Sequence, residues 1–277
     1  MVRSKVSRFF IYFALIFGVL LILVPLYLTV ITPFKTPAEN AVSFFQFPSK
    51  LYLDNFTKIL SSPVYYKSLI NTVYVTIFSL AGCILLMPMI SYAIARSMSR
   101  SRWYRIMYFY ILLGIFIPFQ VKMVPLVRLM SSMHLMQPTG LSILYISCST
   151  CETVFLFVQF FRSIPYELEE AAYIDGATTS QTYHRVILPL LKPMIATVLI
   201  KNGLWIWNDF MLPLLVLNRT SDNWTLTLFQ YNFKSEYTVD YGPAFATFVM
   251  SMLPIMIFYC FMQKHIIGGL TAGSVKM

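Results

Sequence analysis

Apolar runs of about 20 residues recur along this chain, and they limit its possible folds more than any other feature. A helix of about 20 apolar residues spans the ~30 Å hydrocarbon core of a bilayer. Charged residues make up 12% of the 277 residues, about half the share typical of soluble domains. The sequence therefore predicts an all-α polytopic membrane protein. We expect six transmembrane helices, near residues 9–33, 68–95, 104–126, 141–161, 193–217 and 242–263.

The placement of Lys and Arg sets the expected orientation of these helices. Basic residues gather before the first run and in the second and fourth loops, and they give most of the net charge of +10. Cytoplasmic loops of membrane proteins carry such an excess. We therefore expect both termini in the cytoplasm, including a tail at 264–277, with the loops 34–67 and 218–241 outside. The same placement makes nucleic acid an unsuitable partner. The basic residues concerned are Arg3, Lys5, Arg8, Arg96, Arg100, Arg102, Arg105, Arg162, Arg185 and Lys192.

Several classes of chemistry are missing from the sequence. Cys148 and Cys151 have the spacing of a zinc or redox motif, but they lie in an apolar run with no second ligand pair nearby. We expect them to pack between helices rather than to bind metal. No Gly-rich phosphate loop ending in Lys and Ser or Thr is present, nor is an HExxH motif or a Ser–His pair. We therefore expect no catalytic residues, no metal and no cofactor bound by this chain.

A polar stretch at residues 162–192 interrupts the apolar pattern on the expected cytoplasmic side. Its first part is acidic, which suits the positive end of a helix dipole. Gly176 follows at a position that favours the positive φ of a helix C-terminus. Thr178 and Gln181 then have the spacing of a capping box that opens a second short helix. The pattern predicts a helix, a glycine break and a helix that dock on a soluble partner. The alternative is a solvated loop without a partner.

The same stretch resembles a motif of a known family. Glu170-Ala171-Ala172-x-x-Asp175-Gly176-Ala177, followed by Ile187-x-Pro189, resembles the EAA loop of ABC-importer permeases. Trp207-Asn208-Asp209-Phe210 and the tail 269–273 are similar to the carbohydrate-uptake branch, in particular its MalG-type subunit. The likeness covers essentially the whole chain. One departure is Tyr183, where the family more often has Phe.

The resemblance implies a fold and a coupling mechanism. The fold would be that of a type I ABC importer permease, with residues 1–277 as a single membrane domain. The EAA segment would dock in a cleft of an ATPase subunit, and that subunit would bind ATP and Mg. The implied coupling residues are Glu169, Glu170, Ala171, Ala172, Asp175, Gly176, Ala177 and Pro189. The tail residues implied to contact the ATPase dimer are Gly269, Leu270, Thr271, Ala272 and Gly273.

The resemblance also implies partners and a substrate. The chain would pair with a second permease subunit, an ATPase dimer and an extracytoplasmic sugar-binding protein, in the bacterial cytoplasmic membrane. The aromatic-rich loop 218–241 would contact the binding protein. The cargo would be a sugar, and the aromatic residues favour an oligosaccharide of the raffinose, maltose or multiple-sugar type. The alternatives are an ABC importer for a polyamine or an anion, and a membrane scaffold or sensor that binds an ATPase.

Ionisable residues within the expected spans are the candidates for the substrate path. Charged groups in a membrane are costly and are usually functional. Glu152 and Lys201 lie at matching depth, so they can pair. Hydrogen-bonding and aromatic side chains nearby suit a sugar, whereas a purely structural ion pair with packed tryptophans is the alternative. The candidate residues are Glu152, Gln159, Lys201, Trp205, Trp207, Asn208 and Asp209.

Overall fold

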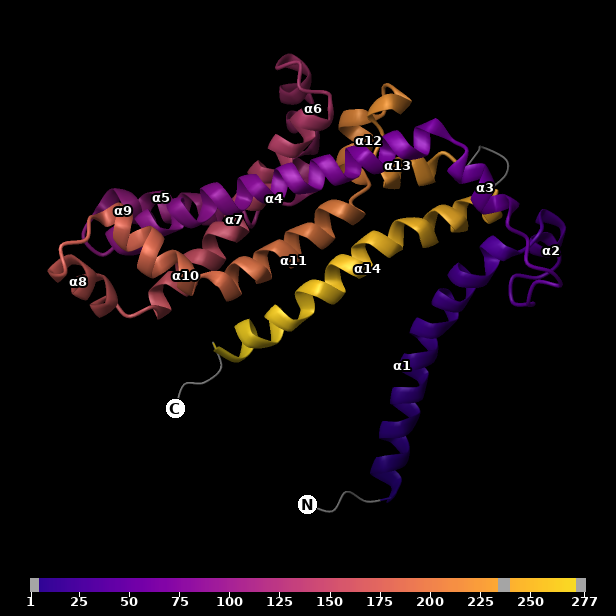
Figure 1. Cartoon of the computed structure of the whole chain (residues 1–277), viewed down its shortest axis with the longest axis horizontal. Coiled ribbons are helices and arrows are strands. Elements are labelled where there is room, and N and C mark those ends of the chain that lie inside the picture. Colours follow the sequence, from indigo (N-terminus) through magenta and orange to yellow (C-terminus); the bar gives the residue numbers. More distant parts are fainter. Residues whose placement is uncertain (1–4, 234–239, 273–277) are drawn as a thin grey trace. The chain divides into compact units, whose positions relative to one another are not determined.

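The computed structural model describes residues 5–233 and 240–272, and all regular structure in these ranges is helical (Figure 1). The long helices are α1 (Lys5–Ile31), α4 (Pro63–Ser97), α7 (Pro138–Ser163) and α14 (Tyr241–Ala272). The shorter helical elements are η1 (Thr32–Phe34), α2 (Pro37–Val42), α3 (Asp54–Leu60), α5 (Arg102–Leu113), α6 (Phe119–Ser132), α8 (Glu167–Ile174), α9 (Thr179–Thr182), η2 (Tyr183–Ile187), α10 (Leu188–Leu190), α11 (Lys192–Asn208), α12 (Met211–Leu217), η3 (Ser221–Asn223) and α13 (Leu226–Tyr231).

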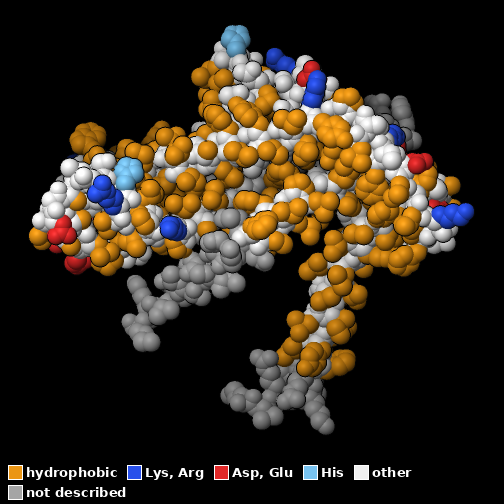
Figure 2. All heavy atoms as spheres, viewed as in Figure 1, with side chains coloured by type: hydrophobic (Ala, Val, Ile, Leu, Met, Phe, Trp, Pro, Cys, Tyr) orange, Lys and Arg blue, Asp and Glu red, His pale blue; other side chains and the backbone are white. Residues whose placement is uncertain are grey.

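Four stretches of the described chain are helical, long and apolar enough to cross a membrane. They are Phe9–Phe34, Pro63–Ser97, Pro138–Ser163 and Tyr241–Phe261. A fifth candidate is the pair Thr179–Leu190 and Lys192–Asn208, which is bent by 67°. The apolar sides of the helices dominate the space-filling view, and charged side chains are sparse on them (Figure 2). The all-α, multi-pass membrane class expected from the sequence is therefore confirmed.

Two of the expected continuous helices are interrupted. The run 104–126 is divided between α5 and α6 by a non-helical stretch that ends at Pro118. Proline lacks an N–H, and it disfavours helical geometry in the residue before it. The run 193–217 is divided between α11 and α12 at Asp209, whose ψ of 133° is extended. Hydropathy averages over such breaks, so the apolar pattern alone predicts one helix in each case.

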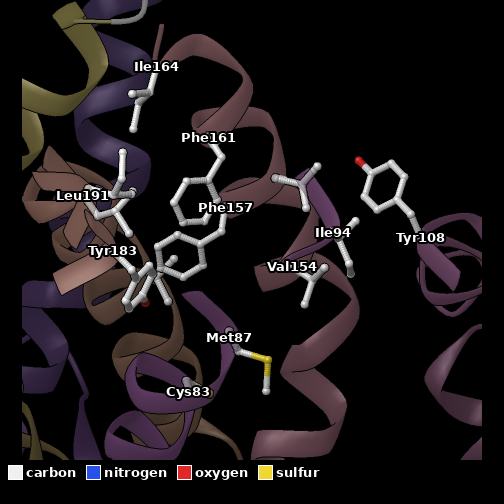
Figure 3. Packing of buried hydrophobic residues seen from close by; sticks show 13 residues of the cluster. Cys83, Met87, Ile94, Tyr108, Val154, Phe157, Phe161, Ile164, Tyr183 and Leu191 are labelled. Atoms are coloured by element: carbon white, nitrogen blue, oxygen red, sulfur yellow. The ribbon is translucent and has the colours of Figure 1, made fainter. Parts of the chain in front are cut away.

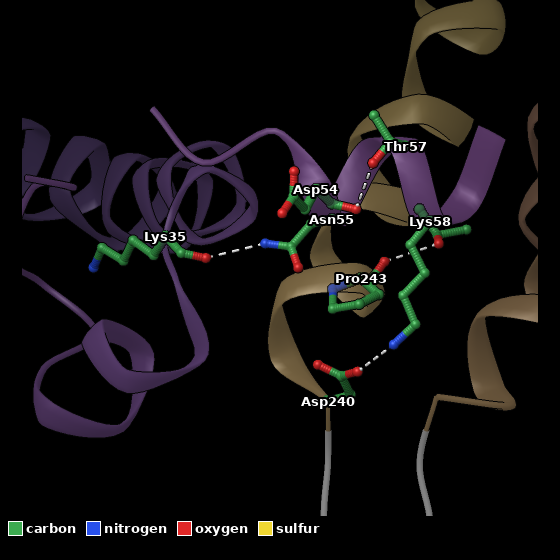
Figure 4. A network of polar contacts seen from close by, with 8 residues as sticks. Lys35, Asp54, Asn55, Thr57, Lys58, Asp240 and Pro243 are labelled. Atoms are coloured by element: carbon green, nitrogen blue, oxygen red, sulfur yellow. Dashed lines mark hydrogen bonds and ion pairs between the residues drawn. The ribbon is translucent and has the colours of Figure 1, made fainter. Parts of the chain in front are cut away.

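We expected one membrane domain, and the packing groups the residues into two compact units, 1–66 with 228–254 and 67–227 with 255–277. In the first unit, the buried Asn55 donates from Nδ2 to the carbonyls of Pro33 (2.8 Å) and Lys35 (3.0 Å). Lys58 forms an ion pair with Asp240 at 2.9 Å (Figure 4). The first expected outer loop is thus an ordered, bonded structure.

In the second unit, α4 and α7 are joined by small polar side chains. The Ser79 hydroxyl donates to the carbonyl of Ser142 (3.3 Å), and Cys83 Sγ lies 3.0 Å from Ser149 Oγ. A Cβ on Gly82 would lie 2.3 Å from the side chain of Ile146. Membrane helices approach closely through small residues of this kind. The close α4–α7 pair is the frame for the polar stretch, and its helix α7 also contributes side chains to the cavity of the candidate site.

A hydrophobic cluster connects the polar stretch to this frame (Figure 3). Side chains of α4 and α7 meet Tyr183, Ile187 and Leu191, which follow the short helix α9. Ile187 and Leu191 are fully buried. The second half of the polar stretch is therefore packed on the bundle rather than free in solvent. The cluster consists of Cys83, Met87, Ile94, Tyr108, Val154, Phe157, Val158, Phe161, Ile164, Tyr183, Ile187, Leu191 and Val198.

Candidate coupling segment and membrane cavity

The polar stretch forms the expected helix–glycine–helix unit, which we call the coupling segment (residues 162–192). Helix α8 ends at Ile174, and Gly176 has a φ of +81°. The Gly176 N–H donates to the carbonyl of Tyr173 (3.0 Å), and the Ala177 N–H donates to that of Ala172 (2.9 Å). These two bonds make a Schellman motif, in which the residue with positive φ is usually glycine. The predicted role of Gly176 in the turn is confirmed.

The second helix of the coupling segment begins as predicted. The Gln181 N–H donates to Thr178 Oγ1 (3.3 Å), and the Thr178 N–H donates to Gln181 Oε1 (2.8 Å). This reciprocal pair is a capping box, which satisfies two otherwise free donors at a helix start. The helix continues through the π-helical turn η2 to Pro189, which is exposed in α10.

The coupling segment exposes apolar and acidic side chains together. Glu170, Ala171 and Asp175 are exposed, and Leu168 keeps 43% of its surface accessible. Ile174 is 85% exposed, the highest value among the exposed large hydrophobic residues of the described chain. Acidic side chains gather beside apolar ones over α8 (Figure 2). The exposed Leu168 and Ile174 make this helix a candidate contact surface. Sequence reasoning missed Ile174, although an isoleucine directly before the Asp-Gly turn was a visible signal.

Glu169 behaves differently from the other acidic residues of α8. It is 1% exposed, and its carboxylate accepts from Arg96 Nε (2.6 Å) and from the Tyr92 hydroxyl (2.7 Å). The sequence grouped Glu169 with residues that face a partner. In the structure Glu169 instead faces inward, toward α4. The exposed glutamates of this helix are Glu167 and Glu170.

The expected tail contacts fall at the edge of the described residues. The backbone of Gly269 to Ala272 belongs to α14, and Gly273 lies outside the described residues.

The second part of the site is a cavity of about 530 Å³ bordered by α6, α7, α11 and α12. Of the seven expected substrate residues, Glu152, Lys201, Trp205 and Asp209 line it. Lys201 Nζ and the Glu152 carboxylate form an ion pair, as their depth predicted. Their side chains keep 40% and 51% of their surfaces accessible. The pair therefore lies on the cavity wall and is not sealed between helices. The full lining is Phe119, Lys122, Cys148, Ser149, Glu152, Lys201, Asn202, Trp205, Asp209, Met211 and Leu212.

The other three expected residues do not line this cavity. Gln159 donates from Nε2 to the Tyr108 hydroxyl (3.0 Å). Asn208 donates to the carbonyl of Leu204 (2.8 Å), within its own helix. Trp207 is 8% exposed and is packed in the protein. The sequence placed them within expected spans, but helical spacing alone does not show which neighbour each face meets.

Asp209 is both a cavity residue and the structural centre of the break between α11 and α12. Its carboxylate accepts from the Tyr145 hydroxyl (2.8 Å) and from the N–H groups of Met211 (3.2 Å) and Leu212 (3.3 Å). Thr227 Oγ1 donates to its carbonyl (2.8 Å). The ring of Trp205 meets Tyr145 edge to face, with centroids 5.3 Å apart. The hydrogen bonds stabilise the break between α11 and α12, and the ring contact packs the indole against Tyr145.

Asn202 is a lining residue that sequence reasoning missed. It is 1% exposed, and its Nδ2 donates to Thr153 Oγ1 (3.3 Å). Its Oδ1 has no partner among the described residues. A buried carbonyl oxygen without a donor is costly. Among the described residues that line the cavity, this oxygen is the one buried side-chain polar atom without a partner. Lys122 and Ser149 are the other polar lining residues that the sequence did not suggest.

The helices and the site define a class of protein, a polytopic membrane protein with a polar cavity and an exposed helix–glycine–helix segment. The sequence profile of the family described as "binding-protein-dependent transport system inner membrane component" matches residues 85–270. The chain belongs to this family. It is a transporter permease subunit and not an enzyme.

Full-length relatives agree with the resemblance found in the sequence. The chain is 46% identical over 277 residues to the multiple sugar-binding transport system permease protein MsmG of Streptococcus mutans serotype c, with 99% of each chain covered. It is 32% identical over 274 residues to AmyC of Thermoanaerobacterium thermosulfurigenes, a probable starch degradation products transport system permease protein, again with 99% of each covered. The resemblance to the carbohydrate-uptake branch is thereby confirmed.

A solved structure shares the fold. It is a chain of a bacterial ABC transporter involved in the import of the acidic polysaccharide alginate, matched with a TM-score of 0.82 at 23% identity, over 95% of this chain and 99% of that one.

Proposed function

We propose that this chain is a permease subunit of a bacterial ABC importer for a sugar, of the oligosaccharide type. The observation that carries the proposal is the membrane cavity, where the Glu152–Lys201 ion pair, the Trp205 indole and the unpartnered Asn202 oxygen meet. Sugar hydroxyls both donate and accept hydrogen bonds, so they could bond to the ion pair, and to the Asn202 oxygen once a rotation of its amide exposes it to the cavity. The indole supplies an apolar surface for the C–H face of a sugar ring. The relatives named for multiple sugars and for starch degradation products support the same substrate class.

The charges of the cavity favour a neutral solute over the alternatives. The lining contains two cationic residues, Lys122 and Lys201, and two acidic ones, Glu152 and Asp209. This formal balance gives no preference for a polyamine or for an anion. A neutral polyhydroxy compound needs no net charge in the cavity and can hydrogen-bond to side chains of either sign.

The proposal includes the arrangement in the membrane. The six spans would be α1, α4, α5 with α6, α7, α11 with α12, and α14, with both termini in the cytoplasm. Basic residues on the coupling-segment side support this orientation. The partners would be a second permease, an ATPase dimer that binds ATP and Mg, and an extracytoplasmic sugar-binding protein.

The coupling segment supplies the connection to the ATPase. Its exposed face combines Ile174 and Leu168 with the carboxylates of Glu170 and Asp175. A cleft with an apolar floor and basic rim would complement it. Closure of the ATPase dimer would displace the segment, and the cavity would open alternately to the two sides of the membrane. The tail 264–277 would add a second ATPase contact.

Replacement of Asn202 by leucine tests the substrate class. Leucine has nearly the same volume but accepts no hydrogen bond, so the half-saturation concentration for oligosaccharide uptake should rise by about 2- to 10-fold, the value of one hydrogen bond. The measurement is uptake of labelled raffinose, maltose, spermidine and phosphate by cells that carry the complete transporter. Asn202→Leu also removes the hydrogen bond between Asn202 and Thr153. Thr153→Val removes only that bond and does not change the cavity lining, so it should leave uptake unchanged.

The outcomes separate the candidate functions. Uptake of spermidine or phosphate instead of oligosaccharides would establish a non-sugar importer. Absence of any solute uptake by a complex that retains its ATPase would support a scaffold or sensor. Unchanged sugar uptake by Asn202→Leu would show that the amide does not contact the solute, because removal of an unsatisfied polar group is otherwise neutral or stabilising.

A further inference from the structure

A buried ion pair joins the coupling segment to the end of α4. Arg96 lies in the last turn of α4 and Glu169 in the first turn of α8, with a separation of 2.6 Å between Nε and Oε1. The side chains are 16% and 1% accessible. Tyr92, one turn earlier on the same face of α4, donates its hydroxyl to the other carboxylate oxygen at 2.7 Å. Both oxygens of Glu169 are therefore bonded to α4.

Arg96 also contacts the first residues of the coupling segment. Its Nη2 donates to the carbonyl of Ile164 (3.2 Å), at the end of α7. Its guanidinium lies over the ring of Tyr166, 5.8 Å from the centroid, and that of Arg100 lies 5.7 Å from the same centroid. The planar arginine group suits such simultaneous hydrogen bonding and stacking. Arg96 thus connects the end of α7, the start of α8 and its own helix.

Stability alone is a weak reason for such a pair. Desolvation of two buried charges offsets much of their attraction, and apolar side chains of equal volume stabilise a protein as well or better. Apolar contacts already attach the second half of the segment to the bundle, through Tyr183, Ile187 and Leu191. The ion pair also fixes the orientation of α8 relative to α4, because charged hydrogen bonds with fixed geometry resist sliding and rotation of one helix against the other.

We propose that Arg96 and Glu169 are positioning residues that make α8 and α4 move as one body, so that α4 receives the displacement of the coupling segment directly. This inference rests on the proposed function, since it needs an ATPase that displaces the segment. Under this proposal the adjacent residues Glu169 and Glu170 have different roles. Glu169 faces inward and transmits movement, whereas the exposed Glu170 meets the partner.

The experiment uses the complete transporter, reconstituted in proteoliposomes with its binding protein. Glu169→Gln keeps the shape of the side chain and removes its charge. We expect the ATPase to remain associated, while the number of sugar molecules transported per ATP hydrolysed falls about tenfold. Exchange of the two charges, with Arg96→Glu and Glu169→Arg together, should recover part of this ratio. The matched control is Glu167→Gln, which removes an exposed carboxylate from the same helical turn and should leave both the association with the ATPase and the ratio unchanged.

A purely structural role would give a different result. Glu169→Gln would then lower the amount of assembled complex, but each assembled complex would transport as many sugar molecules per ATP as wild type; that result overturns the proposal. Should Glu169→Gln not assemble, Arg96→Lys keeps the positive charge but loses the planar guanidinium and its fixed hydrogen-bond geometry, and an unchanged ratio in that variant overturns the proposal too. Failure of the wild-type complex to couple ATP hydrolysis to uptake would instead refute the proposed function.

Discussion

Replacement of Gly176 by valine is expected to abolish most solute uptake while membrane insertion stays normal. Gly176 has a φ of +81°, and a β-branched residue in this region is strained by about 1–3 kcal/mol. Such a strain lowers the equilibrium constant for forming the native turn by about 5- to 150-fold. Apart from its two chain neighbours, no residue has a heavy atom within 4 Å of the position that a Cβ would take, so the effect comes from the backbone conformation. The measurement is uptake per molecule of permease in the membrane.

Gly176→Asn is the matched control for this prediction. Asparagine adds a side chain of similar size but adopts the left-handed region far more readily than valine. We expect the asparagine variant to retain most of the uptake. Equal loss in both variants would show that the exposed surface at this position matters and that its backbone geometry does not. Wild-type uptake by the valine variant would show that coupling does not depend on this turn.

The turn at Gly176 was predictable because its causes are local. A glycine after an acidic helix start, followed by Thr178 and Gln181, specifies a Schellman motif and a capping box through bonds that span a few residues. The apolar runs predicted the helical class for the same reason. Neither prediction required knowledge of which elements meet in space.

The different orientations of Glu169 and Glu170 were not predictable in this way. They are identical in chemistry and adjacent in sequence, and only the position of α4 decides which one is buried. The Glu152–Lys201 pair was predictable from depth in the membrane, because both depths follow from helix rise. Asn202 was not, since its importance depends on a cavity bordered by four helices.

The ion pair between Glu152 and Lys201 gives the other large expected effect. Reversal of either charge alone places two like charges together within a membrane span, where ionised groups are already costly. We therefore expect Glu152→Lys and Lys201→Glu each to reduce the amount of folded permease in the membrane severely. The double exchange restores opposite charges, so it should recover expression. The measurement is the amount of intact permease in purified membranes, with sugar uptake measured in parallel.

Uptake in the double exchange separates the two interpretations of this pair. The side chains are half accessible on the cavity wall, so exchange also swaps the donor and acceptor positions that a sugar would meet. We expect expression to return and uptake to remain at least tenfold below wild type, which corresponds to about 1.4 kcal/mol or more. Full recovery of uptake would show that the pair is purely structural.

Lys58 and Asp240 form an exposed pair in the other compact unit and serve as the control. Their exchange should alter expression little, since exposed pairs contribute only about 0–1 kcal/mol.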